Sequence, residues 1–303
     1  MDPLGRPRFS GSMTNVRTGT TTTTSTTSST ILVTGGTGKT GRRVAQRLLA
    51  AGHEVRIGSR TGEPRFDWHD RSTWPAAVDG VAAAYLAYAP DLAFPGAAEV
   101  VGELAAYAVD HGVERLVLLS GRGEVGAAAA EALVREAGAA WTIVRASMFA
   151  QNFTEGAFVE QVVEGAVMLH VDDVAEPFVD VDDIAEVAAA ALTDGRHAGQ
   201  VYDVTGPRLL TFTGALDAIG SVIGRPVAYV RITADELASG LAAAGFPDDD
   251  ARHLVALFTE ILDGRNSSVA DGVQRALGRP ARDFDEVVAA ATVAGMWTAE
   301  EVA

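Results

Sequence analysis

The sequence contains no cysteine, which excludes disulfide bonds, thiolate nucleophiles and cysteine-ligated metal sites. It has a single lysine, Lys39, so its other side chains of permanent positive charge are all arginine. No window of roughly 18 apolar residues is present, and we expect no membrane-spanning helix. Basic residues are scarce beside acidic ones, 24 against 40, and the net charge of −16 argues against nucleic-acid binding. These absences favour a cytoplasmic monomer or homodimer that acts on a small molecule.

What the chain does have is enough apolar sequence for a large core, 48% of 303 residues. Residues 1–29 are polar, are rich in threonine and serine, and lack the apolar segment of a secretory signal. We expect a disordered tail there, or a mis-assigned start with Met13 as the alternative initiator. The sequence then divides into a nucleotide-binding core at residues 30–153 and a substrate-binding lobe at residues 154–303 that contributes further strands and helices.

Residues 31–41, ILVTGGTGKTG, predict a strand, a tight turn and the start of a helix. The glycines of this turn allow a sharp bend, close approach of the backbone to a pyrophosphate, and close packing of helix on strand. The new helix directs free N–H groups and the positive end of its dipole at an anion. A plain strand-to-helix turn is the alternative. The predicted cofactor contacts here are Gly35, Thr37, Gly38, Lys39, Thr40 and Gly41.

A second strand is predicted at residues 53–58, and Ser59 and Arg60 follow it directly. Arg60 stands about 20 residues after the last glycine of the turn, where dinucleotide-binding proteins place the residue that reads the ribose. An acidic residue there binds a free 2′-hydroxyl, whereas a hydroxyl and a guanidinium suit a 2′-phosphate. The pair therefore predicts NADP(H) as the cofactor, with a solvated surface arginine as the alternative.

Strands and helices alternate along the rest of the first half, and the strands are apolar enough to be buried on both faces. This pattern predicts an α/β fold with a doubly wound parallel sheet of the Rossmann type, followed by a smaller, mostly helical lobe. Predicted strands are residues 64–67, 81–88, 115–120, 141–145, 167–170, 178–181, 200–204 and 227–232. Predicted helices include residues 96–112, 124–138, 155–164, 182–192 and 212–223, and Thr233 with Glu236 predicts a capping box.

Several motifs, in this order, resemble the NmrA-like branch of the atypical short-chain dehydrogenase/reductase superfamily. They are residues 33–41, 59–60, 118–121, 141–149, 151–153, 178–185 and 202–207, within a resemblance that covers about residues 30–295. The resemblance implies a dinucleotide-binding Rossmann core. That branch includes NADPH-dependent reductases of quinones, imines and phenolic ethers, and also dinucleotide-binding regulators that catalyse nothing.

One feature of the superfamily is missing. Classical members use a Tyr-x-x-x-Lys pair, in which the lysine lowers the pKa of the tyrosine so that it can pass a proton. Four residues before Lys39 stands Gly35, and the segment after Ser120 that begins at Glu124 supplies no tyrosine. A reduction must then draw its proton from elsewhere. Iminium or enone-type acceptors fit, because hydride addition to them can precede protonation by solvent.

Candidate catalytic residues stand near predicted strand ends, where open α/β sheets bind ligands. Ser120 could hold a carbonyl group, or simply cap a turn. Tyr88 could stack on the cofactor or donate a proton, or be a rim aromatic. His170 is the candidate general acid, because histidine titrates near neutrality, although a surface or core histidine is the commoner case. The substrate contacts predicted are Met148, Phe149, Gln151, Asn152, Phe153 and His170, and the resemblance places Asp67 and Trp68 beside the adenine.

Acidic clusters are interpreted as helix starts and not as metal sites. Asp180, Asp182 and Asp183 precede a predicted helix, and residues 248–250 follow a proline, so their carboxylates can accept hydrogen bonds from free N–H groups. We predict no metal. The leading hypothesis is an NADP(H)-dependent reductase of a small enone, quinone or imine-like metabolite. The alternatives are a redox-sensing regulator and a non-redox enzyme, such as a cyclase or isomerase, on the same fold.

Overall fold

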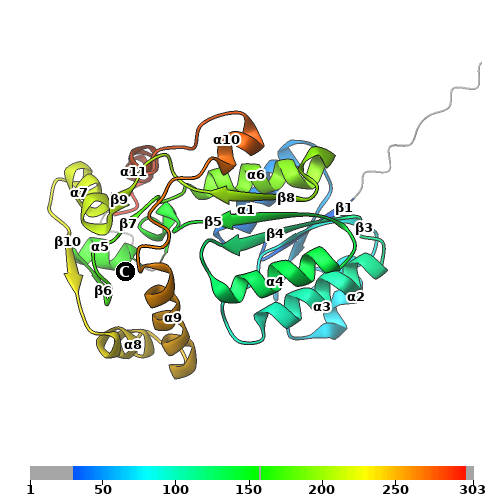
Figure 1. Ribbon diagram of the computed structural model, residues 1–303, viewed down its shortest axis with the longest axis horizontal. Helices are drawn as coiled ribbons and strands as arrows, with labels where there is room; N and C mark the ends of the chain where they lie inside the picture. The colour runs from blue at the N-terminus through cyan, green and yellow to red at the C-terminus, as the bar shows by residue number, and fades with distance from the viewer. Residues whose placement is uncertain (1–29, 157, 298–303) are drawn as a thin grey trace, which may run out of the picture.

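The computed structural model describes residues 30–156 and 158–297. The tail expected at residues 1–29 lies outside the described residues. Figure 1 shows a body built on a twisted sheet and, beside it, a mostly helical lobe. Both parts contribute to the edge of the sheet at which the candidate site lies.

The body is organised around six parallel strands in the order β2-β1-β3-β4-β5-β8. The order reverses between β1 and β3, which opens a crevice at the carboxyl ends of these strands. This arrangement confirms the predicted doubly wound parallel sheet. The strands are β1 (Thr30–Thr34), β2 (Val55–Gly58), β3 (Val81–Leu86), β4 (Arg115–Gly121), β5 (Ala140–Ala146) and β8 (Gln200–Val204).

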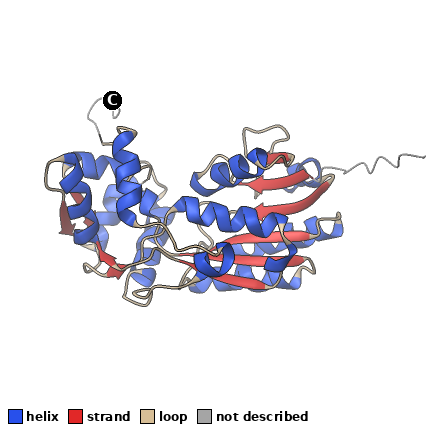
Figure 2. Cartoon of the chain, turned by 90° about the horizontal axis from the view of Figure 1, so that it is seen from above, coloured by secondary structure: helices blue, strands red, loops and turns tan. Residues whose placement is uncertain are grey.

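Helices cover both faces of the sheet, as Figure 2 shows from above. One core lies under α1 (Lys39–Ala50), α6 (Val181–Thr193) and α10 (Gly272–Leu277), and the other lies under α2 (Trp74–Val78), α3 (Ala97–Asp110) and α4 (Val125–Glu136). Successive residues of β3 enter opposite cores, Tyr85 the first and Leu86 the second. Because each strand is buried on both faces, its sequence is apolar almost throughout.

The second lobe has its own core, which is rich in phenylalanine. The rings of Phe153, Phe178 and Phe212 lie 5.4 to 6.2 Å apart, centroid to centroid, a spacing typical of packed aromatic pairs. Its elements are α5 (Val159–Glu164), β6 (Ala166–Leu169), β7 (Ala175–Glu176), β9 (Leu210–Thr211), α7 (Phe212–Ile223), β10 (Ala228–Arg231), α8 (Ala234–Ala243), α9 (Asp248–Ile261) and α11 (Phe284–Val293). Three short 3-10 turns, η1 (Arg71–Thr73), η2 (Ala150–Asn152) and η3 (Gly195–His197), complete the described elements.

The chain crosses between body and lobe more than once. α6 packs beside α1, and β8 extends the main sheet, although both follow residue 153 in sequence. The division at residue 153 stays a prediction for the function of each part. Structurally, the segment that begins with α6 returns to the body before the chain builds the rest of the lobe.

Two predicted strands are wrong. Residues 64–67 form only an isolated bridge between Ser59 and Arg65. Residues 178–181 lead into α6 instead, because Asp180 turns the backbone and accepts a hydrogen bond from the Asp182 N–H as its N-cap. The interpretation of the acidic residues as helix starts is thus confirmed at α6, and also at α9, whose first turn is residues 248–250. The capping box of Thr233 and Glu236 is confirmed at α8.

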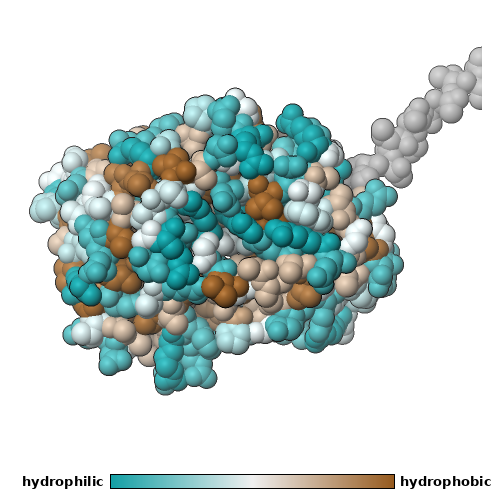
Figure 3. Space-filling model, viewed as in Figure 1, coloured by the Kyte–Doolittle hydropathy of each residue, from teal (hydrophilic) through white to brown (hydrophobic). Residues whose placement is uncertain are grey.

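Among the residues that the structure describes, no helix has the length and apolar character needed to cross a membrane. The face drawn in Figure 3 is mostly hydrophilic or intermediate, with its most hydrophobic residues in small separate groups.

Candidate active site

The glycine turn joins β1 to α1 at the carboxyl edge of the sheet. Gly35 has φ +60°, and a side chain on Gly41 would place its Cβ 2.2 Å from the Gly35 carbonyl oxygen, so glycine is required at both positions. α1 begins after Gly38, and it has no side-chain cap and no acidic residue in its first turn. Its first N–H groups and its positive dipole end are therefore left for an anion, which fits the pyrophosphate of a dinucleotide.

Ser59 and Arg60 follow β2 at the same edge. The Arg60 side chain is exposed. It is the one arginine of the described ranges for which no hydrogen bond and no ion pair is found, whereas the others bind carboxylates, carbonyls or neighbouring side chains. A guanidinium without a protein partner, at the end of the second strand, has its full set of donors available to a phosphate.

Tyr88 connects the nucleotide side of the edge to the cavity described below. Its ring packs edge-on against Trp68 at 5.4 Å, and its hydroxyl lies 3.2 Å from His69 Nε2. Burial, together with Asp250, raises the pKa of Tyr88. This shift opposes a role as proton donor, which needs a lowered pKa. Trp68 is itself 8% exposed and belongs to the core, and the Asp67 carboxylate binds Arg65 and the His69 N–H.

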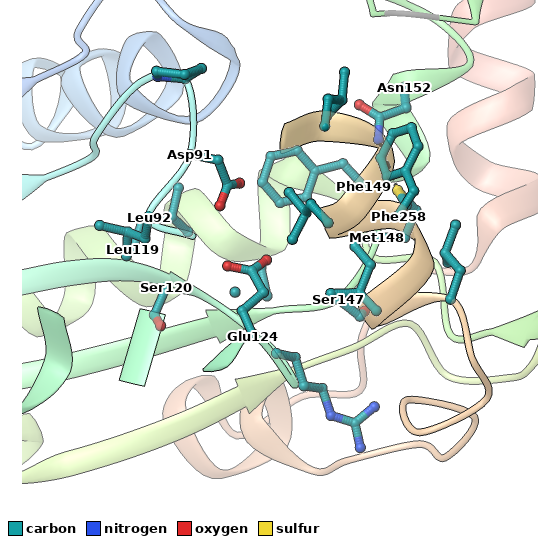
Figure 4. Close-up of a pocket in the computed structure, with 18 of the residues that line it drawn as sticks. Asp91, Leu92, Leu119, Ser120, Glu124, Ser147, Met148, Phe149, Asn152 and Phe258 are labelled. Atoms are coloured by element: carbon teal, nitrogen blue, oxygen red, sulfur yellow. Dashed lines mark hydrogen bonds between the residues drawn. The ribbon is translucent and has the colours of Figure 1, made fainter. Parts of the chain in front are cut away.

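A cavity of about 470 Å³ opens between the carboxyl ends of β3, β4 and β5 and the lobe helix α9. Its walls are mostly apolar and aromatic, which is typical of sites for small organic ligands. Figure 4 shows the residues that surround it. The apolar part of the lining includes Leu92, Phe94, Leu119, Met148, Phe149, Phe246, Leu254, Leu257 and Phe258.

Lys39 belongs both to the glycine turn and to the cavity. Its ammonium donates to Asn152 Oδ1 over 2.8 Å, and a side chain on Gly156 would place its Cβ 2.4 Å from Lys39 Nζ. Burial lowers the pKa of Lys39, and the nearby Arg42 and Arg43 lower it further. The structure thus brings together a residue predicted for the cofactor and a residue predicted for the substrate.

Ser120 lines the cavity, but its hydroxyl is already bound. The side chain is 3% exposed and donates to Glu131 Oε1 over 2.8 Å, and Glu131 also receives hydrogen bonds from Arg145 and Arg135. In Figure 4 the hydroxyl points away from the carboxyl groups of Asp91 and Glu124. Within the described residues Ser120 therefore ties β4 to α4.

Three residues predicted for the substrate lie outside the cavity lining. The Gln151 amide donates to Asp180 and accepts from the Val181 N–H, so it joins η2 to the start of α6. Phe153 is fully buried in the aromatic core of the lobe. His170 follows β6, and its Nε2 lies 2.7 Å from Thr259 Oγ1, away from the residues that line the cavity. Burial and Arg231 lower the pKa of His170, so it is neutral at pH 7. Met148, Phe149 and Asn152, in contrast, do line the cavity.

Sequence reasoning missed a pair of carboxyl groups inside the cavity. Asp91 follows β3 and Glu124 immediately precedes α4, and a hydrogen bond joins their side chains. Burial, then the nearby Asp91, raises the pKa of Glu124 to about 9, and burial raises the pKa of Asp91. Only one feature of the sequence indicates this pair: Asp91 and Glu124 each follow the carboxyl end of a predicted strand, where ligands bind in open α/β sheets.

A third carboxyl group lines the same cavity at Glu176, which is 2% exposed. Its Oε1 has no hydrogen-bond partner among the described residues, and burial raises the pKa of Glu176 to about 7, although Arg122 opposes the shift. Asp250 of α9 is also part of the lining. The cavity wall therefore contains four carboxyl groups, beside the basic side chains of Lys39 and Arg122.

Comparison with known proteins gives a consistent result. No protein-family model matches the chain. It is 35% identical over 280 residues to YesF, an uncharacterised oxidoreductase of Bacillus subtilis (strain 168), over 88% of this chain and 96% of that protein. It is 30% identical to an NAD(P)H azoreductase of Xenophilus azovorans, over 84% of this chain and 95% of the relative.

Among solved structures, the triphenylmethane reductase of Citrobacter sp., crystallised with NADP(H), superposes with a TM-score of 0.70 at 21% identity. The match covers 86% of this chain and 99% of the reductase, and it shows that the two share a fold. The identity to the bacterial relatives, over nearly their whole length, shows common descent. The chain therefore belongs to the NmrA-like family of oxidoreductases within the atypical short-chain dehydrogenase/reductase superfamily.

Proposed function

We propose that the chain is an NADP(H)-dependent reductase of a small metabolite with an enone, quinone or imine-like acceptor group. The observation that carries this proposal is the position of Lys39. It begins the helix that follows the glycine turn, and it also lines the cavity of about 470 Å³. A dinucleotide on the turn and a substrate in the cavity would therefore meet at one edge of the sheet.

The residues of the turn fit the cofactor. The N–H groups at the uncapped start of α1 would receive the pyrophosphate, and Arg60, with Ser59 beside it, would receive the 2′-phosphate. Trp68 and Tyr88 would border the adenosine and nicotinamide sides. The bound nicotinamide supplies a hydride. Two of the relatives described above carry NAD(P)H or NADP(H) in their names, which supports the same cofactor for this chain.

The cavity favours a small, largely apolar acceptor. Its walls combine aromatic and aliphatic side chains with a few polar groups, a composition that binds organic ligands and orients them through the polar groups. Met148 and Phe149 from the end of β5 would contact the substrate from one side, and Phe258 of α9 from the other. Asn152, held by Lys39, would orient a carbonyl or imine group.

The test is consumption of NADPH by the purified protein. Binding of NADPH and NADH is first measured by calorimetry, and the nicotinamide absorbance is then followed with menadione, cyclohexenone, a cyclic imine and an azo dye. We expect binding of NADPH in preference to NADH, and turnover with at least one acceptor. Binding without turnover of any acceptor would favour a regulator or a non-redox enzyme. Absence of binding would refute the proposal.

A further inference from the structure

Several side chains of the cavity could donate a proton, but most of them already donate a hydrogen bond to another side chain or have a raised pKa. The Ser120 hydroxyl donates to Glu131, and Lys39 donates to Asn152. Tyr88 has a raised pKa and is therefore a poor acid. The sequence offers no Tyr-x-x-x-Lys pair. A neutral acceptor still needs a proton when it takes up a hydride, so the source of that proton has to be found elsewhere in the lining.

Glu124 is held at the cavity by local backbone geometry. It is the residue before the first turn of α4, and its carboxyl group lies directly on the backbone of Gly121, where a Cβ would fall 1.7 Å from Glu124 Oε1. Any side chain at position 121 would displace it. Asp91 approaches from the loop after β3 and is fixed by a hydrogen bond from the Ala93 N–H at 2.8 Å. Figure 4 shows the two carboxyl groups facing each other.

The surroundings of the pair keep a proton on it. Over the described ranges, neither Asp91 nor Glu124 has an ion-pair partner. The charged groups that act on Glu124 from the neighbouring elements are Asp91, Glu131 of α4 and Glu260 of α9, and all three are acidic. The neighbouring arginines have other partners. Arg145 binds Glu131, and Arg265 binds Glu260. Arg122, which also lines the cavity, donates to the carbonyl oxygens of Asn266 and Ser268. Two partly buried carboxyl groups that share a hydrogen bond and have no ion-pair partner retain one proton between them at neutral pH, because desolvation and like charge both disfavour a second ionisation.

We propose that Glu124, hydrogen-bonded to Asp91, is the proton donor of the reduction, and that the physiological acceptor is a neutral conjugated carbonyl compound. Asp91 is a positioning residue that keeps the proton on Glu124. The proposal rests on the proposed reductase function and makes it more specific. Geometry supports it, because Glu124 lies just after the carboxyl end of β4 and lines the cavity together with the apolar side chains of α9.

For an enone, the acceptor gains a hydride at its β carbon. The electron pair of its C=C bond forms a new double bond between the α carbon and the carbonyl carbon, and the π pair of the C=O bond moves onto the carbonyl oxygen. Glu124 gives its proton to that oxygen: the carboxyl O–H bond breaks and an O–H bond to the substrate forms, which yields an enol that becomes the saturated ketone. The substrate is reduced by two electrons, and NADPH is oxidised to NADP⁺. The Glu124 carboxylate then takes a proton from solvent.

The first experiment compares two acceptors in the full-length protein. Glu124→Gln keeps the shape of the side chain but has no acidic proton. With cyclohexenone, which needs a proton, we expect kcat to fall by about 100-fold or more, the usual contribution of general acid catalysis. With the cationic dye malachite green, which takes up a hydride alone, we expect kcat within about 3-fold of wild type. Equal losses with both acceptors, or no loss with cyclohexenone, would overturn the proposal.

A second experiment does not depend on turnover. The infrared difference spectrum between the wild type and Glu124→Gln, recorded without cofactor, should contain the carbonyl band of a protonated carboxylic acid at pH 7, and the band should disappear towards pH 10. Its absence at pH 7 would overturn the assignment of the proton even if the protein proves to be a reductase. If NADPH binds and no acceptor is reduced, the reductase function fails and the proton-donor role fails with it, while the band still reports the state of Glu124.

Two further variants separate positioning from general damage. Asp91→Asn removes the like charge, so the kcat/KM for cyclohexenone should decline at a lower pH than in the wild type, as the pKa of Glu124 falls. Glu103→Gln is the control. Glu103 pairs with Arg71, lies outside the cavity lining and is not among the groups that act on Glu124, so its replacement should leave the ratio of the two acceptor rates unchanged. A changed ratio in Glu103→Gln together with an unmoved pH profile in Asp91→Asn would contradict the proposal.

Discussion

The two halves of the site, one beside β1 and β2 and the other beneath α9, differ in the chemical groups that form them. The half beside β1 and β2 is made of backbone and of one exposed cation: the glycine turn, the uncapped start of α1, and Arg60. The half beneath α9 is made of side chains: apolar walls, the partly buried carboxyl group of Glu124 and the buried one of Glu176. The first half attracts a fixed, highly charged anion, and the second encloses a neutral or weakly polar molecule.

Elsewhere in the described residues, several charged side chains form ion-pair networks. Between α1 and α6, Arg43 and Arg47 bind Asp182, and further along α6 the buried Asp183 binds Arg279 and Arg282. These networks fix helices against one another. In both halves of the site, by contrast, charged or titratable groups lack such partners. A charged or titratable side chain without a partner costs free energy in the folded state unless a ligand binds it. Such side chains therefore mark the positions at which ligands are expected.

Among the variants that test the two halves of the site, Gly41→Ala should have the largest effect. The new Cβ would meet the Gly35 carbonyl at 2.2 Å, and because both atoms belong to the backbone of the turn neither can move aside. We expect the Kd for NADPH to rise by about 100-fold or more, equivalent to ~3 kcal/mol, as measured by calorimetry. Gly240→Ala is the control, since a Cβ there meets nothing within 4 Å. Unchanged binding in Gly41→Ala would show that the turn does not hold the cofactor.

Arg60→Ala should have the next largest effect, and a selective one. A charge-assisted contact to a phosphate contributes about 1.5–3 kcal/mol, so the Kd for NADPH should rise by about 10- to 100-fold. The Kd for NADH, which lacks the 2′-phosphate, should change by less than about 2-fold on the same scale. The measurement is a pair of titrations by intrinsic fluorescence. Equal losses for the two dinucleotides would assign Arg60 to the solvated surface.

Sequence analysis predicted the first half of the site better than the second, and the reason is physical. A turn that needs glycine at fixed spacing is encoded within a few residues, and so is a parallel sheet of apolar strands. Asp91 and Glu124 come from loops that follow two different strands. These loops meet under α9, a helix about 130 residues later in the chain. No local sequence pattern predicts such a contact. His170 shows the converse: its residue type suggested acid–base chemistry, but its ring contacts the Thr259 hydroxyl and is not part of the cavity lining.

The third prediction concerns stability and probes the cavity half alone. The folded state raises the pKa of Glu124 to about 9, whereas the unfolded value is 4.5. Between these values the folded state binds more protons than the unfolded state, so wild-type stability declines as pH rises through this window. Glu124→Gln lacks the titration. We expect its melting temperature to exceed that of the wild type by ~5 °C at pH 9, for about 2 kcal/mol, and the gap to narrow towards pH 5. A gap that is independent of pH would show that Glu124 titrates normally.

The smallest predicted effect tests the junction between the two halves. Lys39→Met removes the donor to Asn152 and a positive charge near the proposed pyrophosphate, and a hydrogen bond of this kind contributes about 1 kcal/mol. If the halves share Lys39, both the Kd for NADPH and the KM for the acceptor should rise by about 5-fold. Lys39→Gln separates the hydrogen bond from the positive charge, because its amide can still donate to Asn152 but carries no charge. It should restore the acceptor KM and leave the NADPH affinity weakened. If Lys39→Met changes only one of the two constants, the halves are independent, and the meeting point of cofactor and substrate must be sought along Tyr88 and Ser120 instead.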